Sequence, residues 1–363
     1  MLKSLFISGR EINYPRNELI ISALQDISSV DVIGIEREDV SKGGERYILS
    51  QSINGFLKAI PKVTLRKYDF IFVGFFGQLL MIPLGLLTKK PIFFDVFVSS
   101  YDTLIYDRKK YKQNSLVARS SYFIDKSSCN LADMIFIDTQ THANYFNKAF
   151  GIAPQKMQVV YVGCDEDLFF PRSLAVDENK VLYYCSYLPL HGVDIVVQAA
   201  KLLQNSIPVK FKLIGDGIEY LKIRSLVNEL GLNNIDFFPS IPIHSLPQEI
   251  ASSAICLGGH FGPSEKAKNV IPGKTFQLLA MRKPVIAGDN AANHELLTHN
   301  QDAWFCEMNN PTALAEAIET LYYDQTLRVR ISNNGYKTFL NKASKAVLRK
   351  QISTIISKNL NHA

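Results

Sequence analysis

Short apolar runs alternate with segments of helical periodicity along the whole chain. The runs Phe70–Val73 and Met134–Ile137 contain no polar position, which is typical of strands buried on both faces of a parallel sheet. Val193–Gln204 places apolar residues three and four positions apart, as a helix with one buried face does. The repeated order of strand, turn and helix predicts an α/β fold with helices on both faces of parallel sheets.

At 363 residues the chain is longer than one hydrophobic core usually serves, so two domains are expected. An acidic, proline-containing stretch, Gly163–Asn179, begins no obvious element and is interpreted as the connection between them. The predicted domains are residues 1–165 and 166–345, with a C-terminal helix over 346–363. A ligand is expected between two Rossmann-like halves, at the carboxyl ends of their strands.

The predicted elements fall into one series on each side of this connection. Strands before it are expected at Lys3–Ile7, Asp31–Ile35, Phe70–Val73, Pro91–Val96, Met134–Ile137 and Gln158–Val162, and helices at Pro15–Ile27, Leu79–Leu87, Leu116–Leu131 and Thr141–Phe150. Strands after it are expected at Val181–Cys185, Lys210–Ile214, Ile235–Phe238, Ile255–Leu257 and Pro284–Ala287, and helices at Val193–Gln204, Glu219–Leu230, Pro272–Met281 and from Pro311 onward.

One uncharged segment, Phe70–Leu87, is long enough to be considered as a membrane span. Glycine and proline divide it, so a buried strand followed by a short apolar helix packed on a sheet is favoured. The N-terminal apolar run is too short for a signal peptide. Five scattered cysteines without a CxxC pair fit a reducing compartment, so a cytoplasmic location is expected.

Composition and charge narrow the classes of partner. The chain has the 47% hydrophobic and 20% charged residues of an ordinary globular protein. Its net charge of +6 favours anionic ligands or surfaces, but no nucleic-acid-binding signature occurs, so nucleic acid is not expected as a partner. The stretch Lys58–Arg119 is rich in Lys and Arg and lies near the apolar Leu79–Leu87. This combination indicates either contact with an anionic membrane or a solvated loop.

The stretch Gly258–Val285 concentrates glycines and lysines directly in front of an apolar helical run. Pro272 suits the first turn of that helix, where free amides and the positive end of the helix dipole attract an anion such as phosphate. Lys274 lies in the same turn, and Gln277 follows on the same face one turn later. The alternative is an ordinary strand–loop–helix connection, for which glycine and proline are the usual residues.

An ordered series of motifs covers most of the chain. Val162–Asp165 with Phe169–Pro171 precedes a series in the second half: Tyr187–Gly192, Leu213–Gly217, Leu230–Leu232, Ile235–Phe238, Leu257–Gly259 with Phe261–Gly262, Val270–Lys274 and Ala280–Ile286. In order and spacing this series resembles the family 4 glycosyltransferases, the group 1 transferases of GT-B fold. The resemblance implies two Rossmann-like domains facing each other across a cleft, with a C-terminal helix, here Ala346–Leu360, that crosses back to the first domain.

The resemblance also implies an activity. A retaining transferase of this family moves a sugar from a nucleotide-sugar donor, held by the C-terminal domain, to a glycan or lipid-linked acceptor, held by the N-terminal domain. Building of a bacterial surface polysaccharide at the inner face of the cell membrane is the expected setting. Two alternatives remain open: a nucleotide-sugar epimerase of the same fold, and a nucleotide-sugar-binding partner without activity.

The donor site implied by the resemblance departs from the family pattern. His191 stands where a lysine is usual, and Ser186 where an arginine is common. The spacing of the family's Glu-x7-Glu motif falls on Asn269 and Gln277, which keep an acceptor oxygen but lose the charge. His191 is equally well read as a half-buried structural residue. The expected donor-binding residues are Gly9, Arg10, Ser186, Gly215, Gly217, Lys266, Asn269, Ile271, Pro272, Gly273 and Gln277.

The expected catalytic groups are Lys274, His191, Asp95 and Asp102. Lys274 would stabilise the leaving diphosphate. On the acceptor side the candidates are Asp95, Asp102, Asp107, Arg108, Asp138 and His142, each of which is alternatively a helix cap or an ion-pair partner. A departing phosphate oxygen is the other candidate base. Asp165-Glu166-Asp167 looks like a metal-binding Asp-x-Asp motif, but it occupies the hinge position, so neither a metal nor another cofactor is expected.

Overall fold

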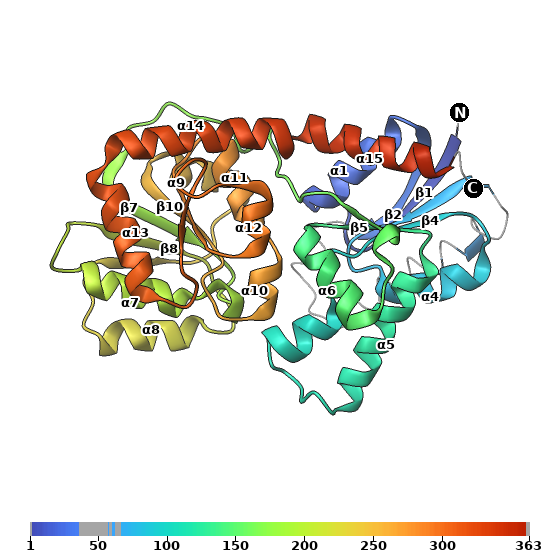
Figure 1. Ribbon diagram of the computed structural model, residues 1–363, viewed down its shortest axis with the longest axis horizontal. Coiled ribbons are helices and arrows are strands. Elements are labelled where there is room, and N and C mark those ends of the chain that lie inside the picture. Colours follow the sequence, from blue (N-terminus) through green and yellow to red (C-terminus); the bar gives the residue numbers. More distant parts are fainter. Residues whose placement is uncertain (1, 36–56, 58–59, 62–66, 361–363) are drawn as a thin grey trace. The chain divides into compact units, whose positions relative to one another are not determined.

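The computed structural model describes residues 2–35, 57, 60–61 and 67–360, and side chains within these ranges except those of Arg10 and Ile35 (Figure 1). The chain divides into two compact units. Unit 1 comprises residues 1–105, 109–163 and 345–363, and unit 2 comprises residues 106–108 and 164–344. Each unit contains a six-stranded sheet whose strand pairs are parallel. The predicted α/β architecture of two Rossmann-like halves is confirmed.

The sheet of unit 1 has the strand order β2-β1-β3-β4-β5-β6. Every residue of β3, β4 and β5 is buried, as the uninterrupted apolar sequences of β3 and β5 predict. The strands are β1 (Leu2–Glu11), β2 (Ser28–Ile35), β3 (Phe70–Val73), β4 (Ile92–Asp95), β5 (Met134–Ile137) and β6 (Met157–Val159). The helices of unit 1 are α1 (Pro15–Gln25), α4 (Gln78–Leu87), α5 (Leu116–Leu131), α6 (Gln140–Phe150) and α15 (Lys345–Leu360), with a π-helical turn at Asp102–Asp107 and a 3-10 turn at Pro154–Lys156.

The apolar segment after β3 is a short helix on the sheet, as predicted. Leu80, Met81 and Leu84 of α4 are buried in one cluster with residues of β1 and β3. None of the helices in the described ranges is both long enough and apolar enough to span a bilayer.

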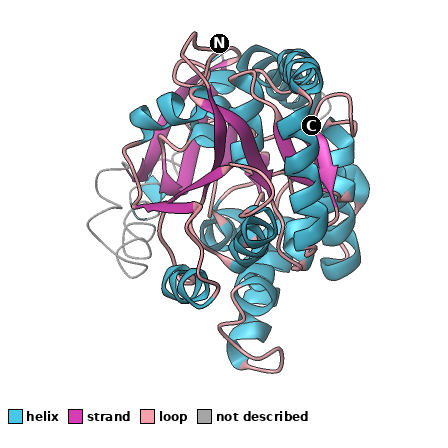
Figure 2. Cartoon of the chain, turned by 90° about the vertical axis from the view of Figure 1, so that its left-hand side faces the viewer, coloured by secondary structure: helices cyan, strands magenta, loops and turns pink. Residues whose placement is uncertain are grey.

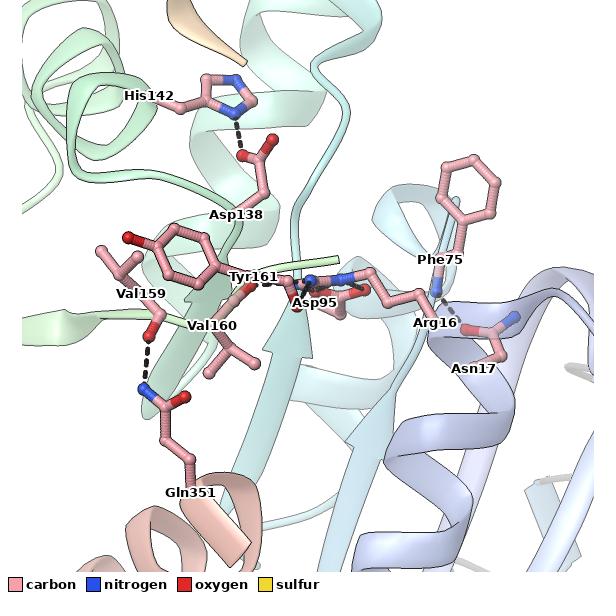
Figure 3. Close-up of polar contacts among 10 residues, drawn as sticks. All are labelled: Arg16, Asn17, Phe75, Asp95, Asp138, His142, Val159, Val160, Tyr161 and Gln351. Carbon is pink, nitrogen blue, oxygen red and sulfur yellow. Dashed lines mark hydrogen bonds and ion pairs between the residues drawn. The ribbon is translucent and has the colours of Figure 1, made fainter. Parts of the chain in front are cut away.

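The C-terminal helix α15 packs within unit 1, as predicted. Leu348, Ile352 and Ile356 recur every four residues, and all three are buried against Leu19 and Ile20 of α1. A side-chain amide adds a polar contact at the edge of the sheet, where Gln351 Nε2 donates to Val159 O at 2.8 Å (Figure 3). At the exposed end, Arg349 forms an ion pair with Asp26. The helix therefore closes the core of the domain that begins the chain.

Unit 2 has the strand order β12-β11-β10-β7-β8-β9, and Figure 2 shows strands in magenta lying between helices in cyan. The chain order reverses between β7 and β10, so this pair forms the topological switch point, where ligands bind in open α/β sheets. The strands are β7 (Asp177–Tyr184), β8 (Lys210–Ile214), β9 (Ile235–Phe238), β10 (Ser253–Gly259), β11 (Val285–Gly288) and β12 (Trp304–Cys306). The helices are α7 (Val193–Leu203), α8 (Tyr220–Glu229), α9 (Leu246–Ala251), α10 (Glu265–Asn269), α11 (Gly273–Ala280), α12 (Ala291–Leu296), α13 (Pro311–Tyr323) and α14 (Gln325–Lys342), with 3-10 turns at Pro189–His191 and Ile243–Ser245.

Several predicted boundaries are wrong. Strand β7 begins at Asp177, inside the stretch interpreted as a connection. The sequence did not predict this start, because the first two residues of the strand are polar and exposed and carry no apolar pattern. Gly9 and Arg10 belong to strand β1 rather than to a loop after it, and the pairing with β2 shifts register between Ile7 and Glu11. The short elements α9, α10, α12 and β12 were not predicted, since each spans fewer than two helical turns or only a few strand residues.

Candidate functional site

The loops that follow β7, β8 and β10 meet at the switch point of unit 2. Tyr183 Oη donates to the carbonyl of His191 at 2.7 Å, and the Phe261 amide donates to the same carbonyl at 3.3 Å. The Gly262 amide donates to Leu190 O at 3.2 Å. These bonds fix the loop after β7 against the loop after β10, although the two are about 70 residues apart in sequence.

Two predicted donor-site glycines permit the loops after β7 and β8 to touch. Gly215 has φ +137, and a Cβ placed there would lie 1.9 Å from the carbonyl oxygen of Cys185. A Cβ on Gly217 would lie 1.9 Å from the carbonyl oxygen of Ser186, whose side chain is exposed. Any larger residue would push these loops apart. The packing alone therefore accounts for both glycines.

Helix α11 presents its N-terminus at this junction. Pro272 is the N-cap rather than a residue of the first turn, because its ψ of 136° is extended, and the helix begins at Gly273. Thr275 N donates to Pro272 O at 2.9 Å, and the amides of Gly273 and Lys274 belong to the first turn, where the helix itself supplies no acceptor. A Cβ on Gly273 would meet nothing within 4 Å. Open space thus adjoins the positive end of the helix dipole.

Lys274 is buried at this helix end, with 9% of the residue exposed. Its ammonium Nζ lies 4.1 Å from the centroid of the Tyr183 ring. Within the described part of the chain, this Nζ has no hydrogen-bonding partner. Burial lowers the pKa of Lys274 to about 8. A buried cation without an acceptor is unfavourable in the free protein, and an anionic ligand would supply what is missing.

Two histidines face this lysine. The rings of His191 and His260 have centroids 5.4 Å apart, and both residues are buried. Burial, reinforced by the charge of Lys274, holds the pKa of each well below its usual range, so both are neutral at pH 7. Leu188 N donates to His191 Nδ1 at 3.2 Å, which leaves the proton of the neutral ring on Nε2. His191 is thus both a structural residue of its loop and a potential donor.

His260 was not predicted as a site residue. Its Nδ1 is buried and has no hydrogen-bonding partner among the described residues. It follows directly after β10, beside the switch point, and this position at the carboxyl end of a strand is the signal that could have identified it.

The two amides in place of the family's glutamates lie on different helices. Gln277 Oε1 accepts a hydrogen bond of 2.8 Å from Tyr184 Oη, so the oxygen expected to bind ribose already has one partner. Asn269 and Lys266 lie on α10, half-buried, and Ser264 caps this helix by accepting from Ala267 N at 3.2 Å. The predicted apolar neighbour Ile271 is buried.

The predicted acceptor group Asp95 is instead the partner of a buried arginine in unit 1. Arg16 Nε and Nη2 donate to Asp95 Oδ1 and Oδ2 over 2.7 to 2.9 Å, and Nη1 donates to Val160 O at 2.8 Å (Figure 3). Burial opposes charge on Arg16, but the Asp95 carboxylate outweighs it and raises the pKa of the guanidinium. Asp95 is 1% exposed and forms the ion pair that was the alternative interpretation, and its role as a catalytic group stays a prediction.

The remaining acceptor candidates of unit 1 are also buried. His142 Nδ1 lies 2.6 Å from Asp138 Oδ1 (Figure 3). The backbone amide of His142 donates to the N-cap Thr139 Oγ1 at 3.0 Å. Asp102 is 4% exposed, and its amide donates to Ser99 Oγ at 3.0 Å.

Two predicted donor-binding residues, Gly9 and Arg10, lie in β1. A Cβ on Gly9 would lie 2.1 Å from Phe76 O, so close packing requires the glycine. The side chain of Arg10 lies outside the described residues.

The Asp-x-Asp stretch forms a local turn. Asp165 Oδ1 accepts from Asp167 N at 3.0 Å, and Asp165 O accepts from Phe169 N at 2.8 Å. In the described ranges, no three His, Cys, Asp or Glu side chains are grouped so as to hold a metal ion. Independence from metal ions stays a prediction.

Comparison with known families gives a match in the C-terminal half. Residues 165–338 match the family model described as glycosyl transferases group 1. This match covers slightly less than half of the 363 residues, and the segment is similar to the group 1 glycosyl transferases. It contains Lys274, His191 and His260, together with the loops that position them.

Curated relatives share part of their length with this chain. An uncharacterized glycosyltransferase of Methanocaldococcus jannaschii is 27% identical over 64% of this chain and 60% of its own length. The lipopolysaccharide core biosynthesis glycosyltransferase LpsD of Rhizobium meliloti is 26% identical over 43% of each chain. The chain therefore spans at most about three fifths of the curated relatives it matches.

Solved structures share the whole fold. Anabaena HepE, crystallised in complex with UDP and glucose, has a TM-score of 0.72 at 17% identity over 99% of this chain and 100% of its own. Sucrose-phosphate synthase from Thermosynechococcus elongatus has a TM-score of 0.77 at 15% identity over 100% of both chains. The predicted GT-B fold is confirmed.

Proposed function

We propose that the protein is a retaining glycosyltransferase that moves a sugar from a nucleotide-sugar donor to a glycan or lipid-linked acceptor. The observation that carries this proposal is the buried Lys274 ammonium without an acceptor, at the N-terminus of α11 and beside the switch point of unit 2. The match of residues 165–338 to the group 1 glycosyl transferases supports the reaction class. UDP in the crystals of HepE supports a nucleoside diphosphate as the ligand.

The donor diphosphate would lie over the first turn of α11. The open space at Gly273 accommodates it, and rotation of Lys274 away from the Tyr183 ring would bring its ammonium to a phosphate oxygen. As the bond to the sugar breaks, negative charge develops on the diphosphate, and the fixed charge of Lys274 with the helix-end amides stabilises it. These groups would replace a metal ion, so the reaction is expected to proceed in EDTA.

The neutral histidines would serve the sugar end of the donor. His191 donates from Nε2 without adding charge, since its Nδ1 is occupied by Leu188 N. The side chains of Asp95 and Asp102 are buried, and this favours a departing phosphate oxygen over either carboxylate as the base that takes the acceptor proton. A role in surface polysaccharide synthesis, in the cytoplasm, completes the proposal.

A panel of ligands tests the proposal. UDP-, GDP-, dTDP- and CMP-linked sugars are added to the protein, and the thermal midpoint of unfolding is measured, because a ligand that binds the folded state raises it. At least one is expected to stabilise the wild type and leave Lys274→Met unmoved. Lys268→Met is the control, since Lys268 lies nearby on α10 but is exposed and paired with Glu265 at 2.8 Å.

Product analysis then separates the alternatives. The stabilising nucleotide sugar is incubated with a pool of glycan acceptors, and sugar transfer with retained anomeric configuration is expected. Epimerised donor without transfer would identify an epimerase, and binding without either product would identify an inactive partner. If none of the nucleotide sugars binds, the proposed donor site is wrong.

A further inference from the structure

Residues 109–126 form a surface of unit 1 that is both basic and apolar, here called the α5 tip. It consists of an exposed loop and the first turns of α5, which extend away from the sheet of this unit (Figure 1). Leu116 is 82% exposed and Phe123 is 64% exposed, and Tyr111 in the loop is also exposed. Single exposed apolar side chains are common, but here two strongly exposed ones lie on one helix beside a basic loop.

These apolar residues are on the outer face of a helix that is already packed. Leu116, Arg119 and Phe123 are three and four positions apart and so share one face of α5. The opposite face is buried through Ala118 and Asp125, among others. The exposure of Leu116 and Phe123 therefore belongs to the finished fold of unit 1, and the inner face of α5 needs no further partner.

The exposed charges of the α5 tip have one sign. The sole acidic residue between positions 109 and 126 is Asp125, which is buried. Its carboxylate accepts hydrogen bonds from Ser99 Oγ at 2.7 Å and from Tyr101 N at 2.8 Å, so it faces inward. The cations of the tip are all exposed: Lys109, Lys110, Lys112, Arg119 and Lys126.

We propose that the α5 tip binds the surface of a membrane that contains anionic lipids. Phospholipid headgroups match the exposed cations, and the acyl region just beneath them accepts Leu116 and Phe123. Arg119 and Lys126, on the same face, reach the headgroups with long stems while the apolar side chains insert. A soluble polyanion would match the cations but would leave Leu116 and Phe123 in water.

The inference goes beyond sugar transfer and does not require it. In combination with the proposed function, a membrane-bound unit 1 would meet lipid-linked acceptors at the bilayer surface. The experiment therefore measures lipid binding and not turnover, so its failure would leave the proposed activity untouched.

Flotation of the full chain with vesicles tests the proposal. Wild type is mixed with vesicles of phosphatidylcholine and phosphatidylglycerol, or of phosphatidylcholine alone, and the bound fraction is measured after centrifugation. Two variants alter the tip: Leu116→Ser with Phe123→Ser, and Lys109→Glu with Lys110→Glu and Lys112→Glu. The matched controls lie in unit 2: Leu221→Ser, where Leu221 is 79% exposed, and Lys210→Glu with Lys222→Glu and Lys337→Glu, which makes the same change in net charge.

Wild type and both controls are expected to float with the anionic vesicles and to remain in solution with the neutral ones. Each tip variant is expected to lose binding by about tenfold or more, given the usual contribution of a few basic residues at an anionic surface. Wild type that stays in solution with anionic vesicles would overturn the proposal. So would charge controls that lose binding as strongly as the charge variant, because net charge alone would then explain it. Full binding by the serine variant would overturn the insertion of Leu116 and Phe123, because charge alone would then hold the protein on the vesicles.

Discussion

Replacing Lys274 with methionine should stabilise the ligand-free protein while abolishing its response to nucleoside diphosphates. Methionine keeps the length and apolar stem of lysine but carries no charge. Lys274 is buried, and the pKa of its ammonium is about 8 in the folded protein, against about 10.4 in an unfolded chain. At about 1.4 kcal/mol per pKa unit, the charged lysine destabilises the free protein by about 3 kcal/mol at pH 7.

The contribution of Lys274 to the free energy of unfolding depends on pH. Between pH 8 and about pH 10.4 the unfolded chain still binds a proton that folded Lys274 has released, so the contribution of this residue to stability rises with pH. Below pH 8 both states hold the proton, and the full unfavourable contribution is present. The Met variant lacks this titration. Its advantage over wild type should therefore be largest at neutral pH and shrink as the pH rises through the pKa of Lys274.

Urea denaturation measures the effect. Midpoints and slopes are recorded at neutral pH and at about two pH units higher for wild type, Lys274→Met and the exposed control Lys268→Met. The control should match wild type, because Lys268 is half exposed and its ion pair with Glu265 contributes little. If Lys274→Met is no more stable than wild type at neutral pH, the ammonium already has a compensating partner and the reasoning about an empty anion site fails.

Three further predictions concern the packing around the two units. Arg16→Met should lower the free energy of unfolding by about 3–5 kcal/mol, because it leaves the Asp95 carboxylate buried and unpaired. Adding Asp95→Leu should restore most of this loss in urea denaturation, and no restoration would mean that Arg16 acts mainly through the carbonyls of Val160 and Tyr161. Gly215→Ala should destabilise the fold by about 1–3 kcal/mol through backbone strain and the clash with Cys185 O. Gly273→Ala should instead leave stability unchanged and weaken nucleoside diphosphate binding. If a calorimetric titration gives Gly273→Ala the same ligand affinity as wild type, the diphosphate binds elsewhere. Gln277→Glu should keep donor binding, because Tyr184 can donate to a carboxylate as well as to the amide, and a loss of binding would show that the side-chain NH2 contacts the donor. Tyr184→Phe should lower the free energy of unfolding by about 0.5–1.5 kcal/mol.

Buried strands and long helices could be predicted because their burial requires apolar residues in a recognisable pattern. Met134–Ile137 and Leu116–Leu131 occur in the structure with their predicted bounds, since an uninterrupted apolar run and a long amphipathic segment have few competing interpretations. The start of β7 could not be predicted, because Asp177 and Glu178 are exposed and show no apolar pattern. Backbone pairing places them in the strand, and pairing is a property of the neighbouring strands rather than of these two residues.

The candidate site likewise has features that the sequence predicts and features that it does not. Lys274 could be identified from its place after a Pro-Gly step, because local sequence determines where a helix begins. The sequence could not predict that the Lys274 ammonium lacks an acceptor, since this depends on Tyr183 and on burial by segments distant in sequence. Asp95 shows the opposite case. Its position at the end of a strand is visible in the sequence, but the arginine that occupies both its oxygens comes from a helix 79 residues earlier.

Calorimetric titration of the ammonium site tests the central claim most directly. The nucleoside diphosphate that gives the largest thermal shift is titrated into wild type and Lys274→Met at pH 8, in two buffers with different ionisation enthalpies. Binding to wild type should take up about half a proton, because Lys274 has a pKa of about 8 in the free protein and becomes fully charged against a phosphate. The Met variant should show no binding. Equal affinity for both proteins, without proton uptake, would contradict a donor site built on Lys274.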